Sequence, residues 1–286
     1  MTFLKVIVLA IVQGLAELLP VSSSAHVVVA EKLMGLDPSA PGMTLLLVML
    51  HTGTMFAVIV YFWRRWRDTY FATMAQFRRT ALQVVVATVL TGVIGEALKV
   101  LIEKTVLRGV PDAQIEDLFS HLEWIAPALA VAGVLILVAG LSERRASRGA
   151  GGELSTGQAA LIGAVQGLCL PFRGFSRSGA TISAGTLCGV GKATAENFSF
   201  ALAVVLTPPV VAREALRVLH TEHKSGAAAF GGVAGPALVG AVLAFLAGLL
   251  ALRWLSQWLE GGRWYLFGVY CLVAAAAVGA LYGAGY

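Results

Sequence analysis

The amino-acid sequence predicts an all-α integral membrane protein with six transmembrane helices and two re-entrant helix–loop–helix units, arranged as two inverted-topology repeats. The first observation is composition, since 58% of the 286 residues are hydrophobic and only 13% are charged. The mean hydropathy of +0.80 lies outside the range of soluble proteins. The other two observations are a series of long apolar segments and a polar motif that occurs twice inside apolar sequence.

Six continuous apolar segments are each near the length of about 20 residues that a helix needs to cross the hydrocarbon core. Two further apolar stretches, about 3–34 and 158–190, are interrupted by proline, serine, glycine and charged residues. A straight helix facing lipid would not tolerate these breaks, whereas a re-entrant helix–loop–helix buried in protein would. The predicted spans are about 43–62, 84–101, 124–141, 197–218, 233–255 and 264–285.

Charged residues in the connecting segments predict the topology. Segments 63–83 and 142–157 are rich in arginine, whereas segment 102–123 is mainly acidic. The positive-inside rule places the first two in the cytoplasm and the third outside, so both termini lie outside. The re-entrant units then enter from opposite sides, and 1–286 forms a single membrane domain of two repeats, about 1–141 and 142–286. The net charge of +5 follows from cytoplasmic basic loops and needs no nucleic acid to explain it.

The first re-entrant unit carries a polar motif. Gln13 and Glu17 are four residues apart, so on a helix they share one face and could hold a metal ion or a polar headgroup. Ser22 and Ser23 follow a helix-ending proline. A serine run is typical of a helix N-cap, but a helix N-terminus also binds phosphate and an exposed serine there can attack phosphorus. His26 lies three residues after Ser23, within reach of it as a general base or acid.

The second unit opens with the same Gln-Gly-Leu triplet, about 150 residues later. The planar guanidinium of Arg177 is suited to phosphate oxygens, and neighbouring hydroxyl and backbone NH groups could complete an anion-binding site. A structural alternative is an ion pair between Arg177 and Glu17 that bridges the two halves, and the two interpretations are compatible if substrate shares that pair. The hydroxyl groups in question belong to Ser176, Ser178 and Thr181.

Two other polar residues are given smaller roles. Arg173 could face cytoplasmic solvent, so it is left outside the phosphate-binding set. His51, within Leu-His-Thr-Gly-Thr, is interpreted as a structural residue that opens or lines a span.

At these motifs the sequence resembles, over essentially its full length, the undecaprenyl-diphosphatase family, the bacitracin-resistance type of integral membrane phosphatase. Residues 13–26 match the signature Glu/Gln-Gly-x-x-Glu-Phe-Leu-Pro-Val-Ser-Ser-x-Gly-His, and residues 174–181 match Pro-Gly-x-Ser-Arg-Ser-Gly-x-Thr. Helix segments 62–65 and 196–200 match as well. Three departures stand out: Gln13 where many relatives have Glu, Ala25 in place of a glycine, and Pro171-Phe-Arg173-Gly174 where Pro-Gly is usual.

The resemblance implies hydrolysis of undecaprenyl diphosphate to undecaprenyl phosphate and inorganic phosphate. The site would face the periplasm from the bacterial inner membrane. The activity would recycle the lipid carrier for peptidoglycan synthesis and confer bacitracin resistance. It implies a divalent cation, Mg²⁺ or Ca²⁺, with Glu17 and Gln13 as candidate ligands. Ser23 is the expected nucleophile with His26 as its base, and an activated water is the alternative nucleophile. The oligomeric state stays open, with a homodimer among the options. The expected phosphate ligands are Ser22, Ser176, Arg177, Ser178 and Thr181.

A polyprenyl-phosphate flippase or transporter is the main alternative, because inverted repeats with broken helices are transporter architecture. The pairing of Ser23 with His26 favours chemistry, since transport requires no nucleophile and base. A type-2 phosphatidic acid phosphatase is disfavoured, because its pattern needs a histidine soon after Ser-Arg and none follows Arg177 until His220. Product formation in detergent would separate an enzyme from a flippase, because flipping requires a bilayer.

Overall fold

The computed structural model describes residues 2–36, 41–106, 108, 115, 118, 121–145, 153–225 and 230–285. Within these ranges the regular structure is entirely helical, which confirms the predicted all-α class. The described helices are α1 (Phe3–Leu18), α2 (Ser23–Leu33), α3 (Pro41–Tyr70), α4 (Met74–Thr105), α5 (Leu122–Arg145), α6 (Thr156–Cys169), α7 (Arg177–Leu187), α8 (Lys192–Ser225), α9 (Phe230–Glu260) and α10 (Tyr265–Gly283).

Six of the described helices contain segments long and apolar enough to cross a membrane, and they coincide with the six predicted spans. The prediction of a loop over 63–83 was wrong, because α3 continues to Tyr70 and α4 begins at Met74. Both helices therefore continue through the arginine-rich sequence beyond their apolar segments. The Thr73 hydroxyl caps α4 by accepting a hydrogen bond from the backbone NH of Gln76 at 3.2 Å. Residues 109–114 and 146–152 of the other two predicted loops lie outside the described residues. The apolar segments that could span are 43–70, 74–105, 122–142, 192–213, 235–260 and 265–283.

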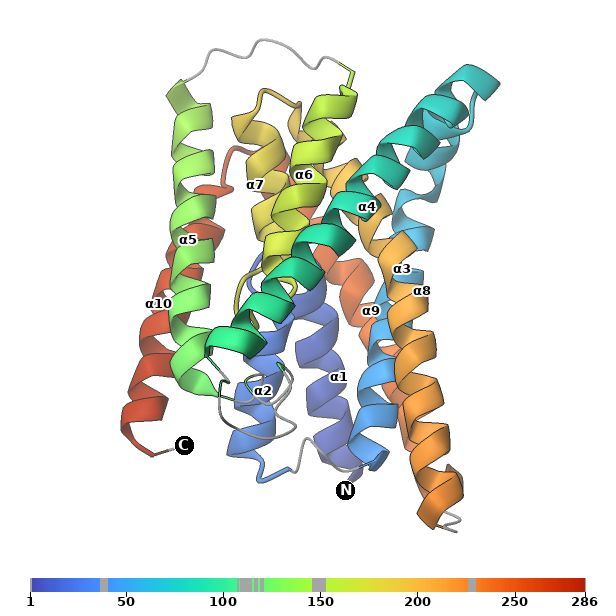
Figure 1. Ribbon diagram of the computed structural model, residues 1–286, viewed down its shortest axis with the longest axis vertical. Helices are drawn as coiled ribbons and strands as arrows, with labels where there is room; N and C mark the ends of the chain where they lie inside the picture. The colour runs from blue at the N-terminus through green and yellow to red at the C-terminus, as the bar shows by residue number, and fades with distance from the viewer. Residues whose placement is uncertain are drawn as a thin grey trace.

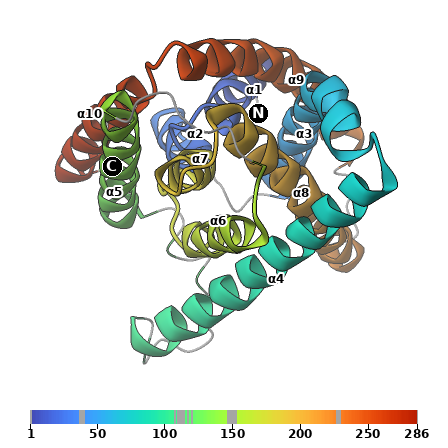
Figure 2. The same cartoon turned by 90° about the horizontal axis from the view of Figure 1, so that it is seen from above.

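The four shorter helices form two pairs that approach from opposite ends of the molecule. Figure 1 shows α1 and α2 in the lower half and α6 and α7 in the upper half, with the broken ends of both pairs near mid-height. Both termini lie at the lower end. Each pair packs against one long helix, α1 against α9 and α6 against α4, while α5 packs against α10. Seen from above, the long helices surround the two pairs (Figure 2).

The repeated Gln-Gly-Leu triplet has the same packing role in both pairs. A Cβ atom added to Gly14 would lie 2.7 Å from the backbone oxygen of Ala244 in α9. A Cβ atom added to Gly167 would lie 2.8 Å from the backbone oxygen of Thr91 in α4. Small residues allow such close backbone approach between membrane helices. The glycine of each triplet therefore fixes a short helix onto its long partner.

The two further helix segments that carry the family resemblance pack against each other, away from the broken helix ends. The ring centroids of Phe62 in α3 and Phe200 in α8 are 5.2 Å apart. Arg65 Nη1 lies 3.5 Å from the buried Glu196 carboxylate, and Trp66 Nε1 donates to the Asn197 carbonyl at 3.3 Å. These contacts join α3 to α8 and explain the two segments as packing elements.

Candidate active site

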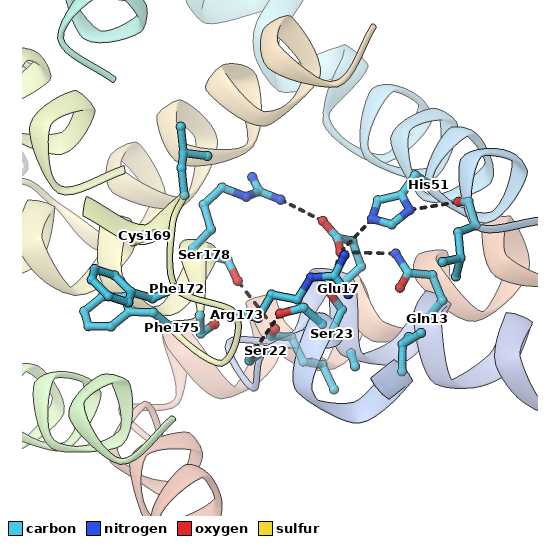
Figure 3. Close-up of a pocket in the computed structure, with 18 residues that line it drawn as sticks. Gln13, Glu17, Ser22, Ser23, His51, Cys169, Phe172, Arg173, Phe175 and Ser178 are labelled. Atoms are coloured by element: carbon cyan, nitrogen blue, oxygen red, sulfur yellow. Dashed lines mark hydrogen bonds and ion pairs between the residues drawn. The ribbon is translucent and has the colours of Figure 1, made fainter. Parts of the chain in front are cut away.

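A cavity of about 300 Å³ lies where the broken ends of the two helix pairs meet. Its polar lining comes from α1, α2, α3, the α6–α7 connection and the start of α7, so both halves of the chain build it (Figure 3). Apolar side chains such as Val27, Leu47 and Phe172 complete the wall. The polar lining residues are Gln13, Glu17, Ser22, Ser23, Ser24, His51, Arg173, Ser176, Arg177 and Ser178.

The turn between α1 and α2 brings a serine onto the carboxylate of the preceding helix. Helix α1 ends at Leu18, and Ser22 then adopts a φ of +66°. A positive φ is uncommon for a residue other than glycine, and such strained positions cluster at functional sites. The turn directs the Ser23 hydroxyl to donate a hydrogen bond to Glu17 Oε2 at 2.5 Å. An adjacent base is the arrangement by which a serine hydroxyl can be activated for nucleophilic attack.

Glu17 collects contacts from four helices. Besides Ser23 of α2, its Oε2 accepts from Gln13 Nε2 of α1 at 3.2 Å and lies 3.8 Å from His51 Nε2 of α3. Its Oε1 accepts from Arg177 Nη2 of α7 at 3.0 Å. The ion pair between Arg177 and Glu17 therefore joins the two halves of the chain, as the structural alternative anticipated.

Arg177 offers a donor to the cavity in addition to its ion pair. It is the first residue of α7, whose N-cap Ser176 accepts from the Gly179 amide at 3.3 Å. Its Nη2 is engaged by Glu17, but its Nη1 is buried and has no hydrogen-bond partner among the described residues. A buried donor without a partner costs free energy. An anion such as phosphate, bound at the start of α7, would satisfy it.

Thr181 lies behind Arg177 and outside the cavity lining. Its side chain is fully buried, donates to the Arg177 carbonyl at 2.8 Å and shares a hydrogen bond of 2.6 Å with Ser199. It supports the first turn of α7, whereas Ser22, Ser176 and Ser178 lie on the cavity wall.

His26 is also held outside the lining. Its Nδ1 lies 2.8 Å from the Ser22 carbonyl, and since a carbonyl only accepts, Nδ1 carries the proton of that bond. Its Nε2 lies 2.7 Å from the Tyr270 hydroxyl, and the two rings stack with centroids 5.7 Å apart. Both ring nitrogens therefore have partners other than Ser23, and the group in contact with Ser23 is Glu17. The general-base role of His26 stays a prediction.

Comparison with known proteins gives the family. The family model described as "Bacitracin resistance protein BacA" matches residues 6–277. The chain belongs to this family. It is 57% identical over 281 residues, 97% of each chain, to a protein of Acinetobacter baylyi named "Undecaprenyl-diphosphatase 2". It is 35% identical over 293 residues, 96% of each chain, to the "Undecaprenyl-diphosphatase" of Acidiphilium cryptum. A Burkholderia orbicola protein named "Undecaprenyl-diphosphatase 2" is 34% identical over 277 residues, 93% of this chain and 92% of its own.

Three polar residues of this BacA-family cavity, Ser24, His51 and Arg173, were not in the predicted site. His51 Nδ1 donates to the Leu47 carbonyl at 2.8 Å, which leaves Nε2 directed at Glu17. The available signal was its position inside a predicted span, where an ionisable residue indicates a functional site by default. Arg173 lines the cavity from the α6–α7 connection, although the sequence analysis left it outside the phosphate-binding set.

The donor groups of the cavity fit a divalent cation only when substrate oxygens complete the site. Among the described residues no group of three or more His, Cys, Asp and Glu side chains gathers at one place. Glu17 is the single carboxylate of the cavity lining. Mg²⁺ is usually bound through one or two carboxylates, water and substrate phosphates. The BacA-family cavity therefore suits a cation shared with a phosphorylated substrate, and not a cation enclosed by protein ligands alone.

Proposed function

We propose that this chain hydrolyses undecaprenyl diphosphate to undecaprenyl phosphate and inorganic phosphate. One observation carries the proposal: the Ser23 hydroxyl donates to Glu17 at 2.5 Å while Arg177, on the other side of that carboxylate, has a buried donor without a partner in the described chain. Nucleophile, base and anion ligand therefore converge in one cavity. The names of the relatives supply the substrate, and the apolar helices around the cavity suit its polyprenyl tail.

The terminal phosphate binds at the start of α7. Arg177 Nη1, the Ser176 hydroxyl and backbone NH groups are the donors available there. The Ser178 hydroxyl, which donates to the Leu19 carbonyl at 3.4 Å, can turn to phosphate when substrate binds. Ser22 adds a hydroxyl from the first unit. Thr181 contributes indirectly, because its hydroxyl donates to the Arg177 carbonyl at 2.8 Å and so supports the first turn of α7.

In the reaction, Ser23 Oγ attacks the terminal phosphorus while its proton passes to Glu17 Oε2. The bond from that phosphorus to the bridging oxygen breaks, and undecaprenyl phosphate leaves as an anion. Water then hydrolyses the phosphoserine, which releases inorganic phosphate and restores Ser23. Arg177 stabilises the negative charge that develops on the phosphoryl oxygens. This scheme gives Glu17 the general-base role that the sequence predicted for His26, because Glu17 is the group in contact with Ser23, and His26 holds the Ser22 turn. In the alternative with water as nucleophile, the same groups align the attacking water.

A divalent cation, Mg²⁺ or Ca²⁺, would be held by the Glu17 carboxylate and the Gln13 amide oxygen together with diphosphate oxygens. Bound there, it would neutralise charge on the phosphate groups.

We further propose that α1–α2 and α6–α7 are re-entrant units of two inverted repeats, about 1–141 and 142–286, in one membrane domain. Their approach from opposite ends and their matching contacts with α9 and α4 support this arrangement (Figure 1). The arginine-rich end where α3 meets α4 would face the cytoplasm. The lower end, with both termini, would face the periplasm of a bacterial inner membrane. There the activity would recycle the lipid carrier for peptidoglycan and confer bacitracin resistance.

Phosphate release from undecaprenyl diphosphate by purified protein in detergent tests the activity. We expect release by the wild type, its loss with EDTA and its loss in Ser23→Ala. Absence of release from folded wild-type protein would contradict the proposal. Lipid movement by that protein in liposomes would then support the flippase alternative.

A further inference from the structure

A second buried carboxylate, that of Glu31, lies beside the cavity and takes no part in the proposed reaction. Glu31 is on α2, seven residues after Ser24 and four after Val27, so all three share one face of the helix. Ser24 and Val27 line the cavity. Glu31 is only 1% exposed, and its Oε1 has no hydrogen-bond partner in the described part of the chain. A buried carboxylate is costly unless an opposite charge lies near it.

Arg173 lines the cavity (Figure 3). Its positive charge acts on the Glu31 carboxylate. The backbone next to Arg173 is fixed. Gly174 has a φ of +102°, and a Cβ atom added there would lie 2.4 Å from the Ile125 carbonyl oxygen, so only glycine fits. The Gly174 amide also donates to Ser24 Oγ at 3.3 Å. The α6–α7 connection is thus attached to α2 immediately beside Arg173.

The cavity therefore has two guanidinium groups with different partners. Arg177 is paired with Glu17 next to Ser23, and Arg173 is associated with Glu31 farther along α2. A guanidinium matches the geometry of one phosphate group. A diphosphate has two phosphate groups and can offer one to each guanidinium, whereas a monophosphate has a single group for both.

We infer that Arg173 is a second phosphate-binding residue, positioned by Glu31, and that it selects a diphosphate headgroup over a monophosphate. The inference rests on the proposed function. Arg177 and Ser23 act on the terminal phosphate, and Arg173 binds the phosphate attached to the lipid. The contact between Arg173 and this phosphate is made both in the bound substrate and in the transition state. Its loss therefore raises KM more than it lowers kcat.

The test compares inorganic pyrophosphate with inorganic phosphate as ligands of the full-length protein in detergent. For Arg173→Ala we expect the pyrophosphate dissociation constant from calorimetry to rise about tenfold or more, as expected for a lost charge-assisted hydrogen bond. The phosphate dissociation constant should change less than about twofold, because Arg177 still binds one phosphate. Arg173→Gln, which keeps more of the side chain, should show the same selective loss if Arg173→Ala folds poorly.

Steady-state kinetics of Arg173 and Glu31 variants give a second measurement. Arg173→Ala should raise the KM for undecaprenyl diphosphate about tenfold, with kcat within about threefold of the wild type. Glu31→Gln should shift KM in the same direction by a smaller factor, and adding it to Arg173→Ala should cause no further loss, because Glu31 acts through Arg173. Lys32→Ala is the matched control, since Lys32 adjoins Glu31 on α2 but lies outside the cavity lining.

Equal losses of pyrophosphate and phosphate binding, or an unchanged pyrophosphate affinity in folded Arg173 variants, would overturn the inference. The calorimetry needs no turnover, so its outcome is independent of the proposed hydrolysis. A wild type without phosphate release would instead refute the proposed function.

Discussion

The two helix pairs start from the same triplet and serve different purposes. Both glutamines are buried, but Gln13 lines the cavity and donates to Glu17, whereas Gln166 lies outside the lining and donates to Thr91 Oγ1 at 3.1 Å. One turn after these glutamines the first pair has Glu17 and the second has Leu170. The shared triplet is therefore a packing element, and the chemistry depends on the residue that follows it.

The turns that connect the helices of each pair also differ in what they contribute to the cavity. Both contain a residue with positive φ, Ser22 in the first and Gly174 in the second. The second turn requires glycine because the Ile125 backbone leaves no room for a side chain, whereas the first accommodates the Ser22 side chain at the cavity. The first pair thus contributes the carboxylate and the proposed nucleophile, and the second contributes the cationic side chains. Neither pair alone contains a complete phosphatase site.

The largest expected effect comes from the carboxylate found only in the first pair. Glu17→Gln should lower kcat for phosphate release about 1,000-fold, because it removes the group that accepts the Ser23 proton. The variant should stay folded, since Gln keeps the shape of the side chain. Turnover near the wild-type rate would show that Glu17 is not the base.

A somewhat smaller loss is expected from the cation of the second pair. Arg177→Ala should lower kcat about 100-fold, as removal of a donor to the transition state does. Arg177→Lys should restore only part of that activity, because an ammonium lacks the planar fork that contacts both Glu17 and phosphate. Full activity in Arg177→Lys would mean that the site requires charge alone.

Variants of His26 and of its partner Tyr270 distinguish a direct role of His26 in proton transfer from a supporting role in the turn. Because His26 bonds to the Ser22 carbonyl and Tyr270, His26→Ala should lower kcat about tenfold through a looser turn, with Tyr270→Phe milder still. A loss in His26→Ala as large as that in Glu17→Gln would instead support His26 as the base. The same steady-state phosphate-release assay measures both.

The smallest effect on turnover is expected at the glycine of the Gln-Gly-Leu triplet, which has the same packing role in both pairs. Gly14→Ala and Gly167→Ala should each destabilise the protein by about 1–3 kcal/mol, because the added methyl group meets the backbone of α9 or α4. Thermal unfolding in detergent measures this, with Gly279→Ala as a control at a glycine that has open space. A loss of stability in only one of the two variants would contradict the shared packing role.

Local patterns were enough to predict the six spans, the two broken segments and three of the central site residues. Apolar segment length determined the spans, and the motif spacing identified Glu17, Ser23 and Arg177. The helix ends at 63–83 were misplaced, because charge marks where the apolar window stops and not where the helix stops.

The remaining differences between the predicted and the observed positions concern side-chain direction. Thr181 was expected to bind phosphate, but a hydroxyl near a helix start can bond backward into the helix, as it does to the Arg177 carbonyl. His51 approaches Glu17 only because α3 lies beside α1 in the folded molecule. No spacing within the sequence encodes that approach.

A double-mutant cycle on phosphate release tests the central claim that the two pairs form one site. The rates to compare are those of the wild type, Glu17→Gln, Arg177→Ala and the double variant. Because these side chains share an ion pair of 3.0 Å and act on one phosphoryl group, we expect the double variant to be little slower than Glu17→Gln alone. Losses that multiply to about 100,000-fold would show that the two residues act independently, and would contradict a single site built from both halves.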